Sequence, residues 1–218
     1  MTRAASYWHG FSEVLLDLIY PKKCSLCGLC GAENPCQACL GEMSPQDLIV
    51  IAEIDSPLDF RASLYPYEGR AAQMVRRLKY SRSTSLAKFM TVQISEAIPK
   101  LGTFDAVIPV PIHWSRQCVR GFNQSDLITE GIAVRARDLR RTRATRPQVG
   151  LNREQRSENL LGAFTAVRSF AGADVLLIDD VVTSGQTARE CARALRDQGA
   201  RGVGILAICG DANWNSNV

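Results

Sequence analysis

The chain has 218 residues, of which 46% are hydrophobic and 22% are charged, and its formal net charge at pH 7 is +4. This length and composition are typical of a soluble globular protein with one ordinary domain and a small addition to it. No apolar run approaches the roughly 20 residues that a membrane-spanning helix needs. The mild positive charge suits an anionic ligand without by itself indicating nucleic acid.

The N-terminal segment, residues 1–21, has apolar residues at helical spacing, which predicts a short amphipathic helix packed against the protein's own body. Charged residues interrupt its apolar stretch and no small-residue cleavage site follows, so the segment does not resemble a secretory signal. We therefore expect a cytoplasmic protein. The apolar positions are Trp8, Phe11, Leu15, Leu18 and Ile19.

Cysteines cluster near the N-terminus, where five of the eight fall within residues 24–39. In a reducing cytosol such a cluster favours a metal site over disulfides. Two C-x-x-C pairs separated by eight residues predict one tetrahedral Zn²⁺ site, with an iron–sulfur cluster as the alternative. Four thiolates leave no open coordination position, so we expect a structural role. The predicted ligands are Cys24, Cys27, Cys36 and Cys39.

Cys30 leaves the ligand set open, because it forms a further C-x-x-C pair with Cys27 and can replace one ligand. The two outer pairs are preferred because they are symmetric and because Gly28 gives the backbone room to turn its amides toward the sulfurs. A redox dithiol is another reading, but no redox-fold pattern surrounds the pairs. The other cysteines are expected to be small core residues; they are Cys118, Cys191 and Cys209.

Beyond a connector at residues 48–57, strand-like and helix-like stretches alternate, which predicts an α/β fold with a mostly parallel sheet flanked by helices. Residues 1–47 are expected to form the N-terminal helix and zinc module, and residues 58–218 a ligand-binding domain. The predicted strands are residues 62–67, 105–110, 175–178 and 203–208, and the predicted helices are residues 69–80, 86–98, 124–136 and 187–198.

Residues 175–187 run from a buried strand into two carboxylates, Asp179 and Asp180, and then into a small-residue loop that opens a helix. Amides and hydroxyls at a helix N-terminus can hold a phosphate, and Gly185 lets the backbone come close to it. The carboxylates can accept hydrogen bonds from ribose hydroxyls. The segment therefore predicts a ribose 5-phosphate pocket. Its loop consists of Thr183, Ser184, Gly185, Gln186 and Thr187.

This segment resembles the signature with which type I phosphoribosyltransferases bind 5-phosphoribosyl-1-pyrophosphate (PRPP): apolar residues, two acidic residues and T-x-G-x-T. The resemblance implies that Asp179 and Asp180 are catalytic and hold the ribose 2′- and 3′-hydroxyls. It also implies that residues 183–187 hold the 5′-phosphate and that Mg²⁺ accompanies PRPP. The sequence contains neither a P-loop motif nor a G-x-G-x-x-G motif after a strand, which argues against two other nucleotide-binding classes.

Further segments are similar to the ComF/GntX family, in its ComFC-like form, and cover nearly the whole chain in that family's order. The resemblance implies a zinc module joined to a type I phosphoribosyltransferase domain, an unknown acceptor, and a role in DNA uptake and natural transformation beside a DNA-translocating helicase. The segments are the two C-x-x-C pairs, residues 78–80, 110–113 and 120–124, Pro147, Gln148, Leu151, Arg156, Asn159 and residues 162–164.

The loop Pro111, Ile112 and His113 lies where type I enzymes bind pyrophosphate, and His113 is either a donor to it or an exposed loop histidine without a role. Arg116 and Arg120 can neutralise phosphate charge.

Residues 135–156 are rich in arginine and form a solvated face, a hood over the pyrophosphate or a path for single-stranded DNA. The lack of aromatic residues there weakens the DNA reading. Lys79 and Tyr80 have either a structural or a ligand-binding role.

Two functions stay open. The first is an enzyme that transfers phosphoribose to an unidentified acceptor. The second is a non-catalytic PRPP- or phosphate-binding module that docks a helicase or single-stranded DNA. A homodimer is the default expectation for this fold. The tripeptide Asn123–Ser125 matches a glycosylation acceptor, which has no consequence in the cytoplasm.

Overall fold

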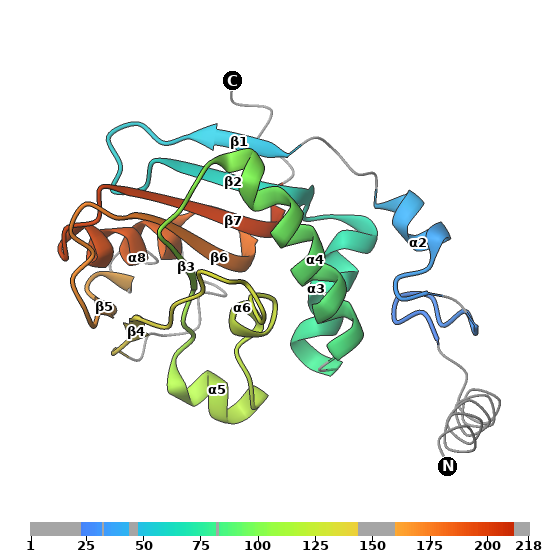
Figure 1. The fold of residues 1–218 in the computed structure, drawn as a ribbon. Coiled ribbons are helices and arrows are strands. Elements are labelled where there is room, and N and C mark those ends of the chain that lie inside the picture. The colour runs from blue at the N-terminus through green and yellow to red at the C-terminus, as the bar shows by residue number, and fades with distance from the viewer. Residues whose placement is uncertain (1–22, 32, 44–47, 82, 144–159, 212–218) are drawn as a thin grey trace, which may run out of the picture.

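The computed structural model describes residues 23–31, 33–43, 48–81, 83–143 and 160–211. A five-stranded sheet in the order β1-β2-β7-β6-β3 forms the centre of the molecule (Figure 1). Strands β2, β7, β6 and β3 are parallel, and the edge strand β1 is antiparallel to β2. The predicted α/β fold with a mostly parallel sheet is confirmed. The strands are β1 (Ile49–Ala52), β2 (Phe60–Pro66), β3 (Ala106–Pro109), β6 (Asp174–Val182) and β7 (Gly202–Gly210).

Helices cover both faces of the sheet (Figure 1). The long helices α3 and α4 pack on one face, and α8 packs on the other beside the small two-stranded antiparallel sheet of β4 and β5. The long helices are α3 (Gly69–Ser81), α4 (Thr84–Leu101) and α8 (Gln186–Arg196). The short elements are α2 (Gln37–Glu42), α5 (Trp114–Arg120), α6 (Gln124–Leu127), β4 (Leu139–Arg141) and β5 (Phe164–Ala166).

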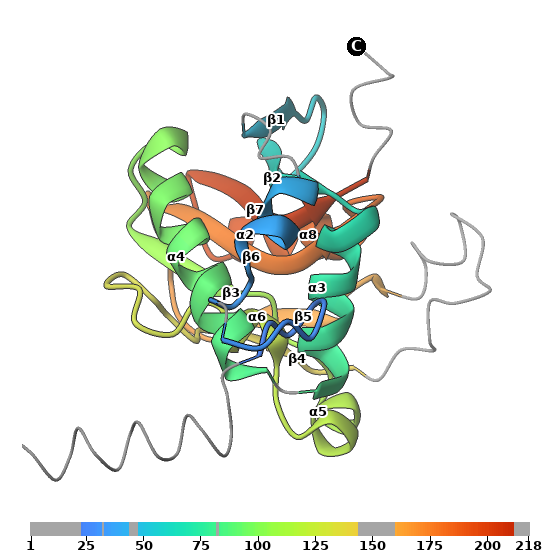
Figure 2. The same ribbon diagram turned by 90° about the vertical axis from the view of Figure 1, so that its right-hand side faces the viewer.

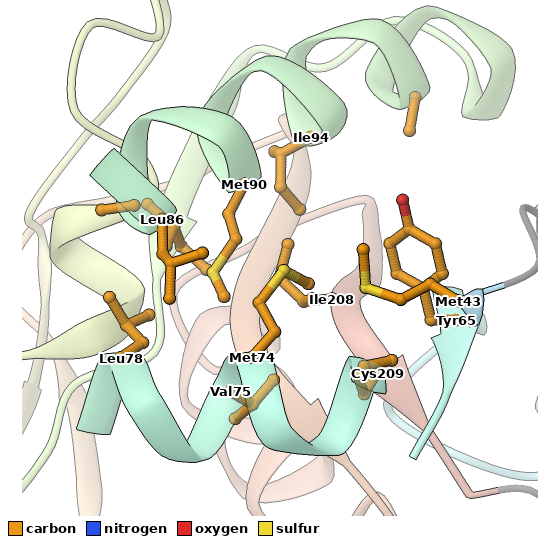
Figure 3. Packing of buried hydrophobic residues seen from close by; sticks show 14 of the residues in the cluster. Met43, Tyr65, Met74, Val75, Leu78, Leu86, Met90, Ile94, Ile208 and Cys209 are labelled. Carbon is orange, nitrogen blue, oxygen red and sulfur yellow. The ribbon is translucent and has the colours of Figure 1, made fainter. Parts of the chain in front are cut away.

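The core has two halves, and the side chains of β6 alternate between them. Leu176 and Ile178 belong to the cluster under α3 and α4, whereas Val175 and Leu177 belong to the cluster under α8. A strand buried on both faces must be continuously apolar, as this one is over these four positions. Figure 3 shows Met74, Leu86, Met90 and Ile94 packing with Ile208 of the neighbouring strand β7. Helix packing on both faces therefore fixes β6 in the sheet.

The segment predicted to be a connector contains strand β1, so that prediction was wrong for residues 49–52. Its residues pair with β2 from Ile49 opposite Ser63 to Ala52 opposite Phe60. A four-residue strand at a sheet edge has little sequence signal of its own, because one side of it is unpaired and its pattern spans only two alternations.

The helix predicted at residues 124–136 is also much shorter than expected. Helix α6 ends at Leu127, and Gly131 adopts a positive φ of 86° that a helix does not allow. The chain then runs beside β3, where the amide of Val107 donates to Val134 and the amide of Ala136 donates to Val107, each over 2.9 Å. Pairing with the free edge of β3 satisfies backbone groups that a continued helix would leave exposed there.

The cysteine-rich segment packs on α3 and α4 (Figure 2). Cys24, Leu26 and Cys39 belong to the buried cluster that lies under these helices. Polar contacts add to this packing: Gln73 Nε2 donates to the Leu26 carbonyl over 3.3 Å, and Asn34 Nδ2 donates to Ser85 Oγ over 2.6 Å. The segment and the sheet therefore share one hydrophobic core. The division at residues 47 and 58 stays a prediction.

The amphipathic helix predicted before residue 22 lies outside the described residues. Among the helices that are described, none has both the length and the apolar composition to cross a membrane.

Replacing Met90 with alanine tests the packing of α4 on the sheet. Met90 is fully buried, so Met90→Ala removes apolar contacts and leaves a cavity, and we expect the free energy of unfolding to fall by about 2–5 kcal/mol. Urea unfolding followed by circular dichroism measures the change. Val92→Ala is the matched control on the same helix, because Val92 is 52% exposed and its truncation should change stability by about 0.5 kcal/mol or less. Equal losses in both variants would contradict this packing.

Candidate functional site

Two adjacent carboxylates, Asp179 and Asp180, lie near the carboxyl end of β6. Asp179 Oδ1 accepts hydrogen bonds from Ser125 Oγ and from the amide of Asp180, both over 2.8 Å. Asp180 is only 6% exposed, and its Oδ1 lies 3.1 Å from Nζ of Lys79. Three elements therefore hold the pair: β6 carries the carboxylates, α6 supplies the serine and α3 supplies the lysine.

Burial and charge both act on the two carboxylates. Burial raises the pKa of Asp179 to about 7, and the negative charge of Asp180 adds to this effect; the bonds from Ser125 and the Asp180 amide, with the charge of Lys79, oppose it. Burial lowers the pKa of Lys79, but the charges of Asp180 and Asp179 outweigh it, so that the net pKa is raised. The site is thus a carboxylate pair with a protonated lysine beside it.

The predicted phosphate loop follows directly, and Gly185 caps helix α8 with a left-handed φ of 74°. Thr183 and Ser184 are exposed, whereas Gly185 is buried. A Cβ at Gly185 would be strained at this φ and would come within 2.8 Å of Arg61 Cδ, so that the Arg61 side chain would have to shift. The loop thus presents hydroxyl groups and the amides of a helix N-terminus close to the carboxylate pair.

The predicted pyrophosphate loop follows β3, but His113 is not an exposed loop histidine. It is 4% exposed and caps helix α5: its Nδ1 accepts from the Ser115 amide over 3.3 Å and lies 2.8 Å from Ser115 Oγ. Because Nδ1 accepts from an amide, the proton of the neutral ring is on Nε2. Its ring packs 5.4 Å from that of Trp114, centroid to centroid.

Beside this loop is a cavity of about 210 Å³, whose walls include Pro111, Asn123, Asp126 and Arg137. Asp126 is paired with both Arg135 and Arg137, the latter at 2.7 Å. Two arginines at the start of this stretch are therefore paired with the protein, while Arg137 keeps 67% of its side chain exposed, so the solvated-face reading also stays open. Residues 144–156 lie outside the described part of the chain, as does the side chain of Arg116. The hood and DNA readings of residues 135–156 stay predictions.

Ser125 is the site residue that sequence reasoning missed. In the sequence its tripeptide matches only a glycosylation pattern. In the structure Asn123 caps α6 by accepting from the Ser125 amide, and it donates to the Val110 carbonyl over 3.0 Å. This cap fixes the serine at the end of β3, next to Asp179. An asparagine before a short helix is a capping signal, but 54 residues separate the serine from its carboxylate partner, so the contact has no local signature.

The four predicted metal ligands come together in space. The sulfurs of Cys24, Cys27, Cys36 and Cys39 all lie within 4.8 Å of one another, with 3.9 Å between Cys24 and Cys39 and 3.6 Å between Cys27 and Cys36. A tetrahedral Zn²⁺ with Zn–S bonds of about 2.3 Å has sulfurs about 3.8 Å apart. Cys30 is exposed and is outside this cluster. The four-cysteine cluster can therefore bind a metal such as zinc.

Backbone amides favour the thiolate form in this cluster. The amides of Leu26 and Cys36 each donate to Cys24 Sγ over 3.4 Å. Burial raises the pKa of Cys24, but hydrogen bonds from the amides of Cys27, Cys36 and Leu26 outweigh it and the pKa falls to about 6. Burial raises the pKa of Cys39 to about 12, so the amides favour the thiolate at Cys24 and not at every sulfur. The donor set therefore fits a metal that binds deprotonated sulfur.

Comparison with known proteins agrees with this architecture. Residues 116–214 match the model of the phosphoribosyl transferase domain. The chain is 30% identical over 227 aligned residues to the DNA utilization protein YhgH of Salmonella typhimurium, covering 96% of this chain and 93% of the relative. It is 28% identical over 198 residues to competence protein F of Haemophilus influenzae, covering 84% and 83%.

A more distant relative is competence protein ComFC of Streptococcus pneumoniae, which is 27% identical over 67% of this chain and 66% of its own. Among solved structures, UMP synthase of Leishmania donovani aligns with 61% of this chain and 24% of its own, with 17% identity and a TM-score of 0.37. The domain match and the full-length relatives together carry the assignment: the chain belongs to the ComF family, with a type I phosphoribosyltransferase domain and an N-terminal four-cysteine module.

Proposed function

We propose that this protein binds PRPP with Mg²⁺ in the cytoplasm and transfers its phosphoribose to an acceptor. The observation that carries the proposal is the carboxylate pair, Asp179 and Asp180, next to the glycine-containing loop at the start of α8. A ribose 5-phosphate needs acceptors for its hydroxyls and donors for its phosphate. The carboxylates at the end of β6 supply the acceptors, and the loop that follows them at the start of α8 supplies the donors.

In the proposed reaction, Asp179 and Asp180 accept hydrogen bonds from the ribose 2′- and 3′-hydroxyls and orient the sugar. The hydroxyls and amides of residues 183–187 hold the 5′-phosphate. The bond from C1′ to the pyrophosphate oxygen breaks while an acceptor nitrogen bonds C1′ from the opposite face and later loses its proton to water. Donors in the loop Pro111–His113 stabilise the charge on the departing pyrophosphate.

The oxygen donors of the site fit Mg²⁺, which takes carboxylate oxygens directly or through water. Asp179 and Asp180 are the residues that would hold it. When bound, Mg²⁺ supplies charge neutralisation for the pyrophosphate. Lys79 forms an ion pair with Asp180, with 3.1 Å between Nζ and Oδ1.

A non-catalytic role is the second candidate, and the names of the relatives favour it, since they are called DNA utilization and competence proteins. In that role the site binds PRPP or phosphate while the protein docks a helicase or single-stranded DNA. The two candidates differ in what they release: a transferase frees pyrophosphate with some acceptor, whereas a docking module shows salt-sensitive DNA affinity or a helicase interface without turnover.

For the metal, we propose that Cys24, Cys27, Cys36 and Cys39 bind one structural Zn²⁺. Binding of Zn²⁺ to four thiolates contributes on the order of 10 kcal/mol, which an ordered segment of this size needs. The metal then stabilises the cysteine-rich segment that packs on α3 and α4.

Replacing both carboxylates tests the ligand assignment. The double variant Asp179→Asn with Asp180→Asn loses the charged acceptors for two ribose hydroxyls, so we expect PRPP affinity to fall by at least about a hundredfold. Isothermal titration calorimetry with PRPP and Mg²⁺ measures it. Asp174→Asn is the matched control, because Asp174 is at the opposite end of β6 in a surface pair with Arg201. An unchanged affinity in the double variant would sink the site assignment.

The raised pKa of Asp179 predicts a pH dependence. The group is ionised only above a pKa of about 7, so PRPP affinity should rise as pH increases through 7. Ser125→Ala removes a hydrogen bond to the ionised form, raises the pKa further and should move this rise about one pH unit higher. Because the phosphates of PRPP titrate equally with both proteins, the difference between the two binding profiles reports on Asp179. Coinciding profiles would contradict the proposed role of the serine.

Zinc content tests the metal ligands. Cys39→Ser removes a ligand buried in the cluster, so this variant should lose its zinc and unfold at a lower temperature. Cys30→Ser, the control outside the cluster, should keep one zinc per chain and the unfolding temperature of the unaltered protein. Atomic emission and thermal unfolding give the two readouts. Zinc lost from Cys30→Ser but kept in Cys39→Ser would show that the ligand set is wrong.

A further inference from the structure

Behind the phosphate loop lies a charged cluster that the reaction above does not use. It consists of Glu53, which follows β1, Arg61 on β2, and Arg189 in the first turns of α8. The side chain of Glu53 is 7% exposed and is paired with both arginines. A buried carboxylate is tolerated only when its charge is compensated, and here two guanidinium groups share it. The cluster therefore has an excess of one positive charge.

Each arginine also holds one carbonyl of the phosphate loop. Arg61 Nη1 donates to the Thr183 carbonyl over 3.1 Å, and Arg189 Nη1 donates to the Ser184 carbonyl over 2.8 Å. Arg189 reaches Glu53 at the same time, with its Nε and Nη2 at 2.9 and 2.7 Å from Glu53 Oε2. The planar guanidinium fork makes these simultaneous bonds possible, and a lysine could not reproduce them.

These contacts set the direction of the amides in the loop. The carbonyl of Thr183 shares a planar peptide group with the amide of Ser184, and the carbonyl of Ser184 shares one with the amide of Gly185. In a trans peptide the N–H and C=O point in opposite directions. Because the Thr183 and Ser184 carbonyls point toward the arginines, the amides of Ser184 and Gly185 point away from the arginines. Arg61 also lies against Gly185, where a Cβ would meet its Cδ at 2.8 Å.

We infer that Glu53, Arg61 and Arg189 form a brace that holds the peptide planes of residues 183–185 with their amides directed at the 5′-phosphate of the ligand. The inference rests on the proposed PRPP function and assigns three positioning residues, which act through the loop and not by contact with the ligand. The excess positive charge of the brace favours the same anion. Free carbonyls would instead be able to rotate toward the phosphate and repel it.

Glu53→Gln gives a test in which the positioning role and a simple charge effect predict opposite changes in PRPP affinity. Removing a negative charge near the loop should tighten anion binding if charge alone matters. If the brace positions the loop, both arginines lose their shared anchor and PRPP affinity falls by about tenfold. Calorimetry with PRPP and Mg²⁺ measures it, and competition by pyrophosphate, which lacks the 5′-phosphate, should stay within about twofold.

Glu42→Gln is the matched control. Glu42 lies on the surface of α2 and also pairs with an arginine, Arg70, and its replacement changes the net charge by the same amount. Should Glu53→Gln fail to fold by circular dichroism, Arg189→Lys replaces it: this variant keeps the charge, loses the fork and should again weaken PRPP about tenfold.

Unchanged or tighter PRPP binding by the folded variant would overturn the brace while leaving the proposed function intact. An equal loss of PRPP and pyrophosphate would overturn it as well, because a general loosening of the site affects both ligands. No PRPP binding by the unaltered protein would instead refute the proposed function, and the brace with it.

Discussion

Strand β6 is buried on both faces from Val175 to Ile178, and the position of the site follows from that burial. A polar side chain in the middle of such a strand would lose its hydration without gaining a partner. Carboxylates can therefore appear only near the strand end, where flanking elements reach them. Asp179 and Asp180 lie there, and α6 and α3 supply Ser125 and Lys79 as partners. The helices that cover the sheet thus also complete the site.

Charge is distributed unevenly along the site. Negative charge is concentrated at the carboxylate pair, with Lys79 beside it. The loop that we propose for the phosphate has two guanidinium groups bound to its carbonyls, and Thr183 and Ser184 in it are exposed. A ligand that suits this arrangement carries hydroxyl groups in its middle and an anionic group at its end. The raised pKa of Asp179 results mainly from its burial, and the negative charge of the neighbouring Asp180 adds to it.

The four-cysteine segment is part of the same physical unit. Its buried residues pack in the cluster that holds α3 against the sheet, and Gln73 of that helix donates to the Leu26 carbonyl. The last turn of helix α3 contains Lys79, which reaches Asp180. Helix α3 thus connects the cysteine cluster with the carboxylate pair. Loss of order in the cysteine cluster would reach the carboxylate pair through the packing of this helix.

Local pattern in the sequence determined the class of fold, the adjacent carboxylates and the cysteine pairs, and it predicts a phosphate loop after the carboxylates. Each of these depends on residues within one or two turns of chain. Strand period, helix period and C-x-x-C spacing are visible without knowledge of any distant partner. Only the tertiary structure decided the rest. The edge strand β1 pairs with β2, the next strand along the chain. The turn of residues 134–136 onto β3, the bond from Ser125 to Asp179 and the brace from Glu53 to Arg189 join segments that are far apart in the chain. The last of these contacts spans 136 residues, a separation over which no periodic pattern carries information, so it exists only once the fold has brought helix α8 beside the segment that follows β1.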